Sequence, residues 1–239
     1  MRTRLIRTWP ARALALVVAA IATATLALAA PAAAHPVPLP TDPSAFDFSD
    51  CPTLPAGLDP TGWQCEVHLA NGDLTIGRVR LRDVPLRLVH AEGPLPSGDD
   101  GQIFGTLQSP AVAIPARGGR GPRMTVQLRY AGYADLIGNG PDPGGLYLRL
   151  AVRGPDLGTN CTIGTLGAPV KTHAARVGDT TTISTDPPIR VFTLQDTAFT
   201  VPAATDCRGH ERQVDERLGL PSTGGNTMTL HAEYTYQPY

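Results

Sequence analysis

The chain has 239 residues, of which 20 are basic and 21 acidic, and its formal charge is −1. This balance argues against nucleic acid as a partner, because nucleic-acid binding needs a clustered basic footprint. It argues equally against attraction to an anionic membrane surface. A chain of this length can bury the core of one all-β domain, so length alone does not indicate two domains.

The first 34 residues have the features of a secretory signal peptide. Four arginines precede an apolar run from Ala13 to Ala30, and Ala32-Ala33-Ala34 supplies the small-residue cleavage site. There is no twin-arginine pair and no cysteine at the cut. We therefore expect cleavage after Ala34 and a secreted, extracellular protein. The segment holds four basic and no acidic residues, so its removal leaves 16 against 21, a net charge of −5.

After the signal peptide, the sequence predicts a proline-rich extended arm over 35–62 and a single β-sandwich domain over 63–239. The arm has seven prolines in 28 residues, a density that disfavours regular structure. In the domain, the glycine-rich and arginine-containing stretch 116–122 is predicted to be a loop.

Strands are predicted where apolar and polar residues alternate with a period of two. Asn71-Gly72 is the strongest hairpin signal, and we expect the strand 74–79 to return antiparallel from that turn. The alternation is clearest at 124–130, 146–152 and 228–236. Further strands are expected at 65–69, 86–90, 102–107, 161–165, 180–184 and 199–201.

One segment, Glu211–Leu218, has helical periodicity. Val214 and Leu218 stand four residues apart, and Gly219 followed by Pro221 ends the helix. One short helix among about ten short strands is the pattern of an all-β fold. The expected architecture is an antiparallel β-sandwich, either immunoglobulin-like or jelly-roll-like.

All four cysteines, Cys51, Cys65, Cys161 and Cys207, follow the cleavage site. An even number in an exported chain predicts two disulfides, for which three connectivities exist. We favour Cys51–Cys65 and Cys161–Cys207, because each pair flanks a coherent unit. The spacings are too wide for the close pairs of a zinc site, so no thiolate metal site is predicted.

The tripeptide His-Ala-Glu occurs twice, at His90 to Glu92 and at His231 to Glu233. Residues i and i+2 of a strand share a face, so each imidazole would lie beside its carboxylate. If the two strands were neighbours, the four side chains could converge as a metal site or an acid–base group. The alternative is two ordinary His–Glu pairs on a wet sheet face.

The loop 135–145 holds Asp135, Asn139 and Asp142 among four glycines. Oxygen ligands in a flexible loop are what calcium needs, which makes these residues a candidate ion site. The spacing does not match an EF-hand, and the same residue types also form ordinary turns.

The segment Leu220–Gly224, LPSTG, matches the pattern that sortases cut. A working sorting signal continues into an apolar membrane segment, but only fifteen residues follow here and they form an alternating strand. We therefore expect the end of the helix and a turn into the last strand, rather than wall anchoring.

No catalytic residue and no cofactor can be assigned from the sequence. There is no GxSxG elbow of a hydrolase, and no GxGxxG or GxxxxGK[ST] phosphate loop. Paired carboxylates suited to glycoside hydrolysis cannot be picked out either, because Asp and Glu fall mostly in turns.

Three motifs stand out near the C-terminus: CTIG at Cys161–Gly164, FTVPAATDC at Phe199–Cys207, and GLPS at Gly219–Ser222. With them the chain resembles secreted actinobacterial (Streptomyces-type) proteins that carry no assigned activity. The likeness covers mainly residues 155–239. The resemblance implies a secreted β-rich domain and a Cys161–Cys207 bridge, and it implies no activity.

These features favour a non-catalytic extracellular protein that binds a carbohydrate or a protein, or that is associated with the cell envelope. We expect no nucleic-acid partner and no membrane association once the signal is removed. One alternative is a secreted hydrolase with an unrecognised site. Another is a secreted protease inhibitor that presents the disulfide-bounded loop Pro52–Trp63.

Overall fold

The computed structural model describes residue 39 and residues 41–115 and 123–239. The predicted signal peptide and the predicted loop at 116–122 lie outside the described residues. Pro36–Tyr239 make up one compact unit. Among the described residues, no helix has the length and apolar character needed to cross a membrane.

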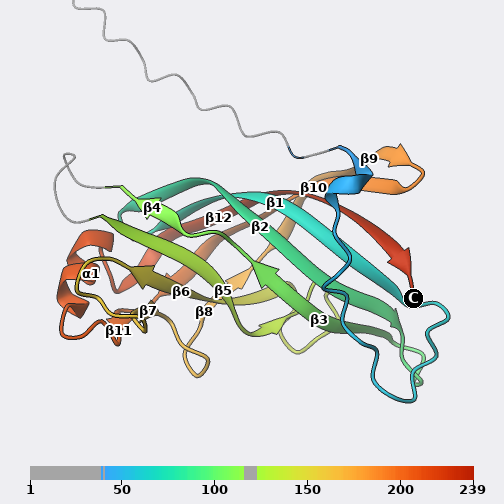
Figure 1. Cartoon of the computed structure of the whole chain (residues 1–239), viewed down its shortest axis with the longest axis horizontal. Coiled ribbons are helices and arrows are strands. Elements are labelled where there is room, and N and C mark those ends of the chain that lie inside the picture. The colour runs from blue at the N-terminus through green and yellow to red at the C-terminus, as the bar shows by residue number, and fades with distance from the viewer. Residues whose placement is uncertain (1–38, 40, 116–122) are drawn as a thin grey trace, which may run out of the picture. The chain divides into compact units, whose positions relative to one another are not determined.

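Two antiparallel sheets lie face to face, which confirms the predicted all-β sandwich with one short helix (Figure 1). The first sheet has the strand order β3 (Asp100–Gln108), β2 (Val79–Pro94), β1 (Gln64–Ile76), β12 (Ser222–Pro238), β10 (Pro188–Val201) and β9 (Ala175–Thr185). The second has the order β11 (Ala204–Thr205), β7 (Thr162–Ile163), β6 (Gly145–Arg153), β5 (Met124–Ala134) and β4 (Val112–Ile114), with β8 (Val170–His173) paired to β6.

The hydrophobic core lies between the two sheets and follows the predicted period of two. In β5, β6 and β12, buried apolar side chains alternate with more exposed ones, because successive side chains of a strand point to opposite faces. Burying one such aliphatic side chain stabilises the fold by about 1.5–3 kcal/mol. The core residues of these strands include Met124, Val126, Leu128, Leu146, Leu148, Leu150, Met228, Leu230 and Ala232.

The hairpin predicted at Asn71-Gly72 is wrong. β1 continues without a break through both residues, and the chain turns at Gly77 instead. Gly77 has a φ of 57°, and its N–H donates to the side-chain oxygen of Asn226 at 2.8 Å. A Cβ added to Gly72 would lie 3.0 Å from Leu230 Cδ2. Close packing across the sheet therefore explains Gly72, and no turn is needed.

The helix α1 (Glu211–Leu218) has the bounds predicted from the sequence, and it lies at the end of the sandwich that holds β7 and β11 (Figure 1). Gly219, in the left-handed conformation, ends it. β12 begins at Ser222, inside the LPSTG segment, so this segment is the expected turn into the last strand. The predicted disulfide between Cys161 and Cys207 is confirmed, and it ties the segment before α1 to the start of β7.

The arm packs on the outer face of the first sheet. Its short 3-10 helix η1 (Pro43–Ala45) leads into Phe46, which is buried against apolar side chains of β1, β2 and β10. These side chains are Val67, Val89 and Ile189. The predicted disulfide between Cys51 and Cys65 is confirmed and joins the arm to β1. The proline content of the arm gave no indication of this second apolar cluster.

Candidate functional site

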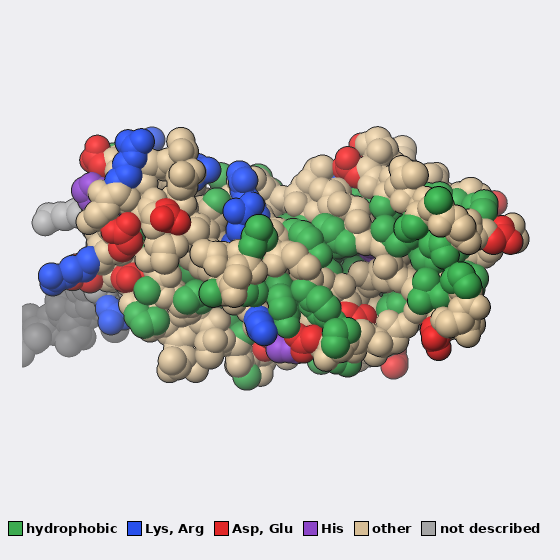
Figure 2. Space-filling model, turned by 90° about the horizontal axis from the view of Figure 1, so that it is seen from below, with side chains coloured by type: hydrophobic (Ala, Val, Ile, Leu, Met, Phe, Trp, Pro, Cys, Tyr) green, Lys and Arg blue, Asp and Glu red, His purple; other side chains and the backbone are tan. Residues whose placement is uncertain are grey.

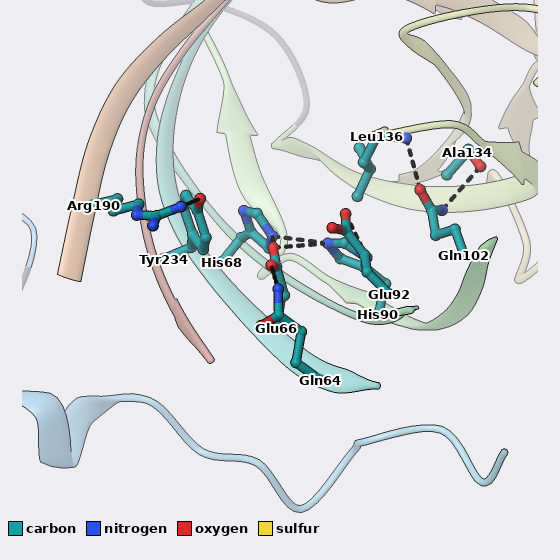
Figure 3. Close-up of polar contacts among 10 residues, drawn as sticks. All are labelled: Gln64, Glu66, His68, His90, Glu92, Gln102, Ala134, Leu136, Arg190 and Tyr234. Atoms are coloured by element: carbon teal, nitrogen blue, oxygen red, sulfur yellow. Dashed lines mark hydrogen bonds and ion pairs between the residues drawn. The ribbon is translucent and has the colours of Figure 1, made fainter. Parts of the chain in front are cut away.

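Four polar side chains meet on the inner face of the first sheet, two from β1 and two from β2 (Figure 3). β1 supplies Glu66 and His68, and β2 supplies His90 and Glu92. The antiparallel register places Glu66 opposite His90. Because residues i and i+2 of a strand share a face, the other two side chains lie on the same face. Only Glu66 and His90 stand directly opposite each other, because His68 faces Leu88 and Glu92 faces Gln64.

Three of these side chains direct their polar atoms at one another. His68 Nε2 lies 2.9 Å from His90 Nε2 and 3.2 Å from Glu66 Oε2. His90 Nε2 lies 3.6 Å from the same Glu66 oxygen. Glu92 Oε1 lies 3.5 Å from the other ring nitrogen of His90, Nδ1. Among the described His, Cys, Asp and Glu residues, Glu66, His68 and His90 are the one group of three or more whose atoms could share a metal ion.

Neighbouring side chains fix the orientation of the group. Gln64 Nε2 donates to Glu66 Oε1 at 2.9 Å, which leaves Glu66 Oε2 directed at the histidines. The His68 ring stacks on both His90 and Tyr234, with a centroid separation of 4.9 Å in each case. The site is therefore built from side chains whose positions are set by a sheet register and by ring packing.

Burial shifts the pKa of each of the four groups toward its neutral form. Desolvation raises the pKa of Glu66 to about 7 and, together with the charges of Glu66 and Asp100, raises the pKa of Glu92 to about 8. Desolvation lowers the pKa of His68 to about 3 and holds the pKa of His90 well below its usual value. Both imidazoles are therefore neutral near pH 7 and keep a lone pair available.

A cavity of about 390 Å³ lies between the sheets, beside this cluster. The wall changes from polar to apolar along the strands: on β1 it passes from Glu66 and His68 to Ala70, and on β2 from Glu92 to Leu88. The polar cluster therefore forms one end of the cavity. Figure 2 shows apolar side chains gathered over the middle of one face of the protein. The remaining apolar wall includes Leu86, Leu107, Leu136, Leu146, Phe192, Leu194, Leu230 and Ala232.

The loop predicted as a calcium site contributes to another wall of the cavity. Asp135 accepts two backbone N–H groups of its own loop, at 2.7 and 2.8 Å. Asn139 donates to the backbone oxygen of Asp100 at 2.6 Å, and Asp142 accepts from the Tyr147 hydroxyl at 2.5 Å. Each of the three side chains is thus engaged by a different partner, in contacts that hold the loop in place.

The structure does not bring the two His-Ala-Glu pairs together. β1 lies between β2 and β12, and Leu230 and Ala232 of β12 face the core, so His231 and Glu233 point to the outer face. His231 is exposed and contacts Thr193, with 3.3 Å between Nδ1 and Oγ1. Glu233 is buried on that face, and burial raises its pKa to about 7. The condition for convergence, that the two strands are neighbours, is not met, so the four side chains do not share one site.

Glu66 and His68 belong to the site, although no motif marks them. By alternation alone they are the polar residues of a half-buried strand, and polar residues of such a strand usually face water. The signal that identifies them is the position of Glu66 opposite His90, with His68 two residues further along on the same face. That signal becomes visible only when the two strands are paired in register.

Two imidazoles, two carboxyl groups and an apolar cavity make up the candidate site. Such an arrangement can bind a small molecule, coordinate a metal ion or transfer protons. Comparisons with protein-family models, curated proteins and solved structures found no match to this chain.

Proposed function

We propose that this is an extracellular binding protein that takes up an amphipathic small molecule between its two sheets. The observation that carries the proposal is the cavity of about 390 Å³ with an apolar wall and a polar end. Small-molecule sites in proteins are concave, mostly apolar and furnished with a few convergent polar groups. The two disulfides support an extracellular location, because such bonds persist in oxidising compartments.

The lining indicates the chemistry of the ligand. Its apolar part would lie against Leu88 and the other aliphatic side chains, in a space equal to that of about a dozen water molecules. Its polar part would meet the carboxyl oxygens and ring nitrogens of Glu66, His68 and Glu92. A hydroxyl, amine or carbonyl group at one end of an aliphatic or aromatic body fits this description.

The wall of the cavity is held in place by hydrogen bonds to β3. Gln102 Nε2 donates to the backbone oxygen of Ala134 at 3.1 Å, and the Leu136 N–H donates to Gln102 Oε1 at 2.8 Å (Figure 3). A wall fixed in this way lowers the entropy that a ligand must offset on binding.

Titration with Nile red, an uncharged apolar dye, tests the proposal. Ala232 lines the cavity, so Ala232→Phe fills part of the space and should weaken dye binding about tenfold or more. His231→Phe is the matched control, because it places the same side chain on the outer face of the same strand. If Ala232→Phe does not fold, Ala174→Phe fills the cavity from the residue that joins β8 to β9. Unchanged dye affinity in a folded cavity-filled variant would contradict the proposal.

A further inference from the structure

We propose that Glu66, His68 and His90 bind a divalent transition-metal cation, zinc in the first instance, with an open coordination position toward the cavity. The cation site stands on side-chain geometry alone. The use of its open position to hold the polar end of a cavity ligand rests on the proposed function.

The spacing of the three ligand atoms matches a tetrahedral metal centre. Zinc binds imidazole nitrogen and carboxylate oxygen at about 2.0–2.2 Å, so adjacent ligand atoms of a tetrahedron lie about 3.3–3.6 Å apart. Here the three separations are 2.9, 3.2 and 3.6 Å. The two Nε2 atoms and Glu66 Oε2 therefore form one triangular face of such a tetrahedron with adjustments of only a few tenths of an ångström.

Hydrogen bonding alone leaves this group poorly satisfied. His90 is fully buried, and a neutral imidazole has one N–H and one lone pair. A single proton on His68 Nε2 would have to serve two acceptors, His90 Nε2 and Glu66 Oε2. The other ring nitrogen of His90, Nδ1, is buried without a hydrogen bond. A cation between the three atoms would accept a lone pair from each.

The surrounding contacts have the form of an outer ligand shell. Metal-bound histidines usually donate a hydrogen bond from the N–H of their second ring nitrogen to a carboxylate or a carbonyl group. Glu92 Oε1, 3.5 Å from His90 Nδ1, needs to move by only about half an ångström to accept that proton. Gln64 fixes the second oxygen of Glu66, and the stacked Tyr234 ring fixes His68.

The donor set selects the class of cation. Two imidazoles and one carboxylate suit zinc, copper, nickel, cobalt or iron, whereas calcium and magnesium prefer oxygen donors alone. Three protein ligands leave the fourth position open, as in zinc sites that bind water or substrate, while structural zinc sites are closed by four protein ligands. Glu66 and His68 both line the cavity, so the open position faces it.

Calorimetric titration of the chelator-treated secreted protein with zinc chloride tests the site. We expect one zinc per chain. His68→Ala should weaken binding by more than roughly 100-fold and Glu92→Ala by about tenfold, because loss of a ligand exceeds the effect of an outer contact. His231→Ala is the matched control, since it removes an exposed histidine from the outer face of the same sheet. His68 is less buried than His90, so its replacement is the safer of the two for folding.

The outcomes separate this site from the proposed function. Absence of one-to-one zinc binding by the folded wild-type protein, or unchanged affinity in folded His68→Ala, overturns the metal site even if Nile red still binds. Zinc binding that persists in Ala232→Phe, where the dye is excluded, supports an independent cation site. Cobalt(II) gives a second readout: tetrahedral visible absorption bands that disappear in His68→Ala support the three-ligand centre, and octahedral bands contradict it.

Discussion

At the residue scale, the site depends on the register of β1 and β2. Glu66 stands opposite His90, and a slip by one residue would turn Glu66 and His68 to the outer face and bring Val67 toward the cavity. The outer face of these strands also carries apolar side chains, Val67 and Val89, which pack against the arm. Because both faces of these strands carry apolar residues, hydrophobic burial alone does not fix the register of β1 and β2. Close contacts at particular residues must fix it.

Gly93 makes one of these close contacts. A Cβ at this position would lie 2.4 Å from Trp63 Cγ, and Trp63 is buried with its indole N–H donating to the backbone oxygen of Pro94 at 3.1 Å. Gly93→Ala should therefore lower the free energy of unfolding by about 2 kcal/mol. Urea denaturation measures the loss. Gly224→Ala, where the added Cβ meets no atom within 4 Å, should change stability by less than about 0.5 kcal/mol. Equal losses in both variants would contradict the contact.

Glu233 should give the protein a measurable pH dependence. Burial raises the pKa of its carboxyl group from 4.5 to about 7 in the folded state. Between these two values the folded state holds the proton more tightly than the unfolded state, so this residue lowers stability as the pH rises and its full cost is reached above about pH 7. Glu233→Gln removes the charge. Relative to the wild type, it should gain about 1 kcal/mol between pH 4.5 and 7, after allowance for screening by solvent. Parallel stability curves for the two proteins would contradict the expectation.

At the element scale, the sequence predicted those elements whose local pattern and burial agree. The helix α1 and the strands β5, β6 and β12 have one clear apolar face, and the structure buries that face. β9 is exposed along nearly its whole length at the edge of the first sheet, so alternation marked only part of it. Only the last residues of β10 were predicted, because the bulged register of this strand interrupts the period of two.

The disulfide between Cys161 and Cys207 should matter most for stability. It spans 46 residues and holds the segment before α1 against β7, so the chain-entropy model gives about 4 kcal/mol for its closure. Replacing both cysteines by Ser should lower the free energy of unfolding by about 2–5 kcal/mol, measured by urea denaturation.

Replacing Cys51 and Cys65 by Ser is the comparison for this experiment. That bridge spans 14 residues and joins the arm to β1, so its loss should mainly release the arm from Val67, Val89 and Ile189. Limited proteolysis should then cut within residues 41–62 while the sandwich still unfolds in one cooperative step. If the variant without Cys51–Cys65 lost cooperative unfolding while the variant without Cys161–Cys207 kept it, the bridge to the arm would be the one that stabilises the sandwich.

At the scale of the whole molecule, the sequence named two of the four side chains that form the candidate site. The His-Ala-Glu motif pointed to His90 and Glu92, and strand periodicity put them on one face. The partners Glu66 and His68 depend on which strand lies next to β2, and alternation within a single strand carries no information about its neighbours. The cavity could not be predicted either. It exists where the small side chains Ala70 and Ala232 pair across β1 and β12 and leave space between the sheets.

The most direct test of the site is anomalous diffraction at the zinc absorption edge from crystals of the protein soaked in zinc chloride. We expect one strong peak within about 2.0–2.2 Å of Glu66 Oε2, His68 Nε2 and His90 Nε2, with its open side toward the cavity. A peak at the partly exposed pair of Asp142 and His173 alone, or no peak at the three-ligand cluster, would contradict the account.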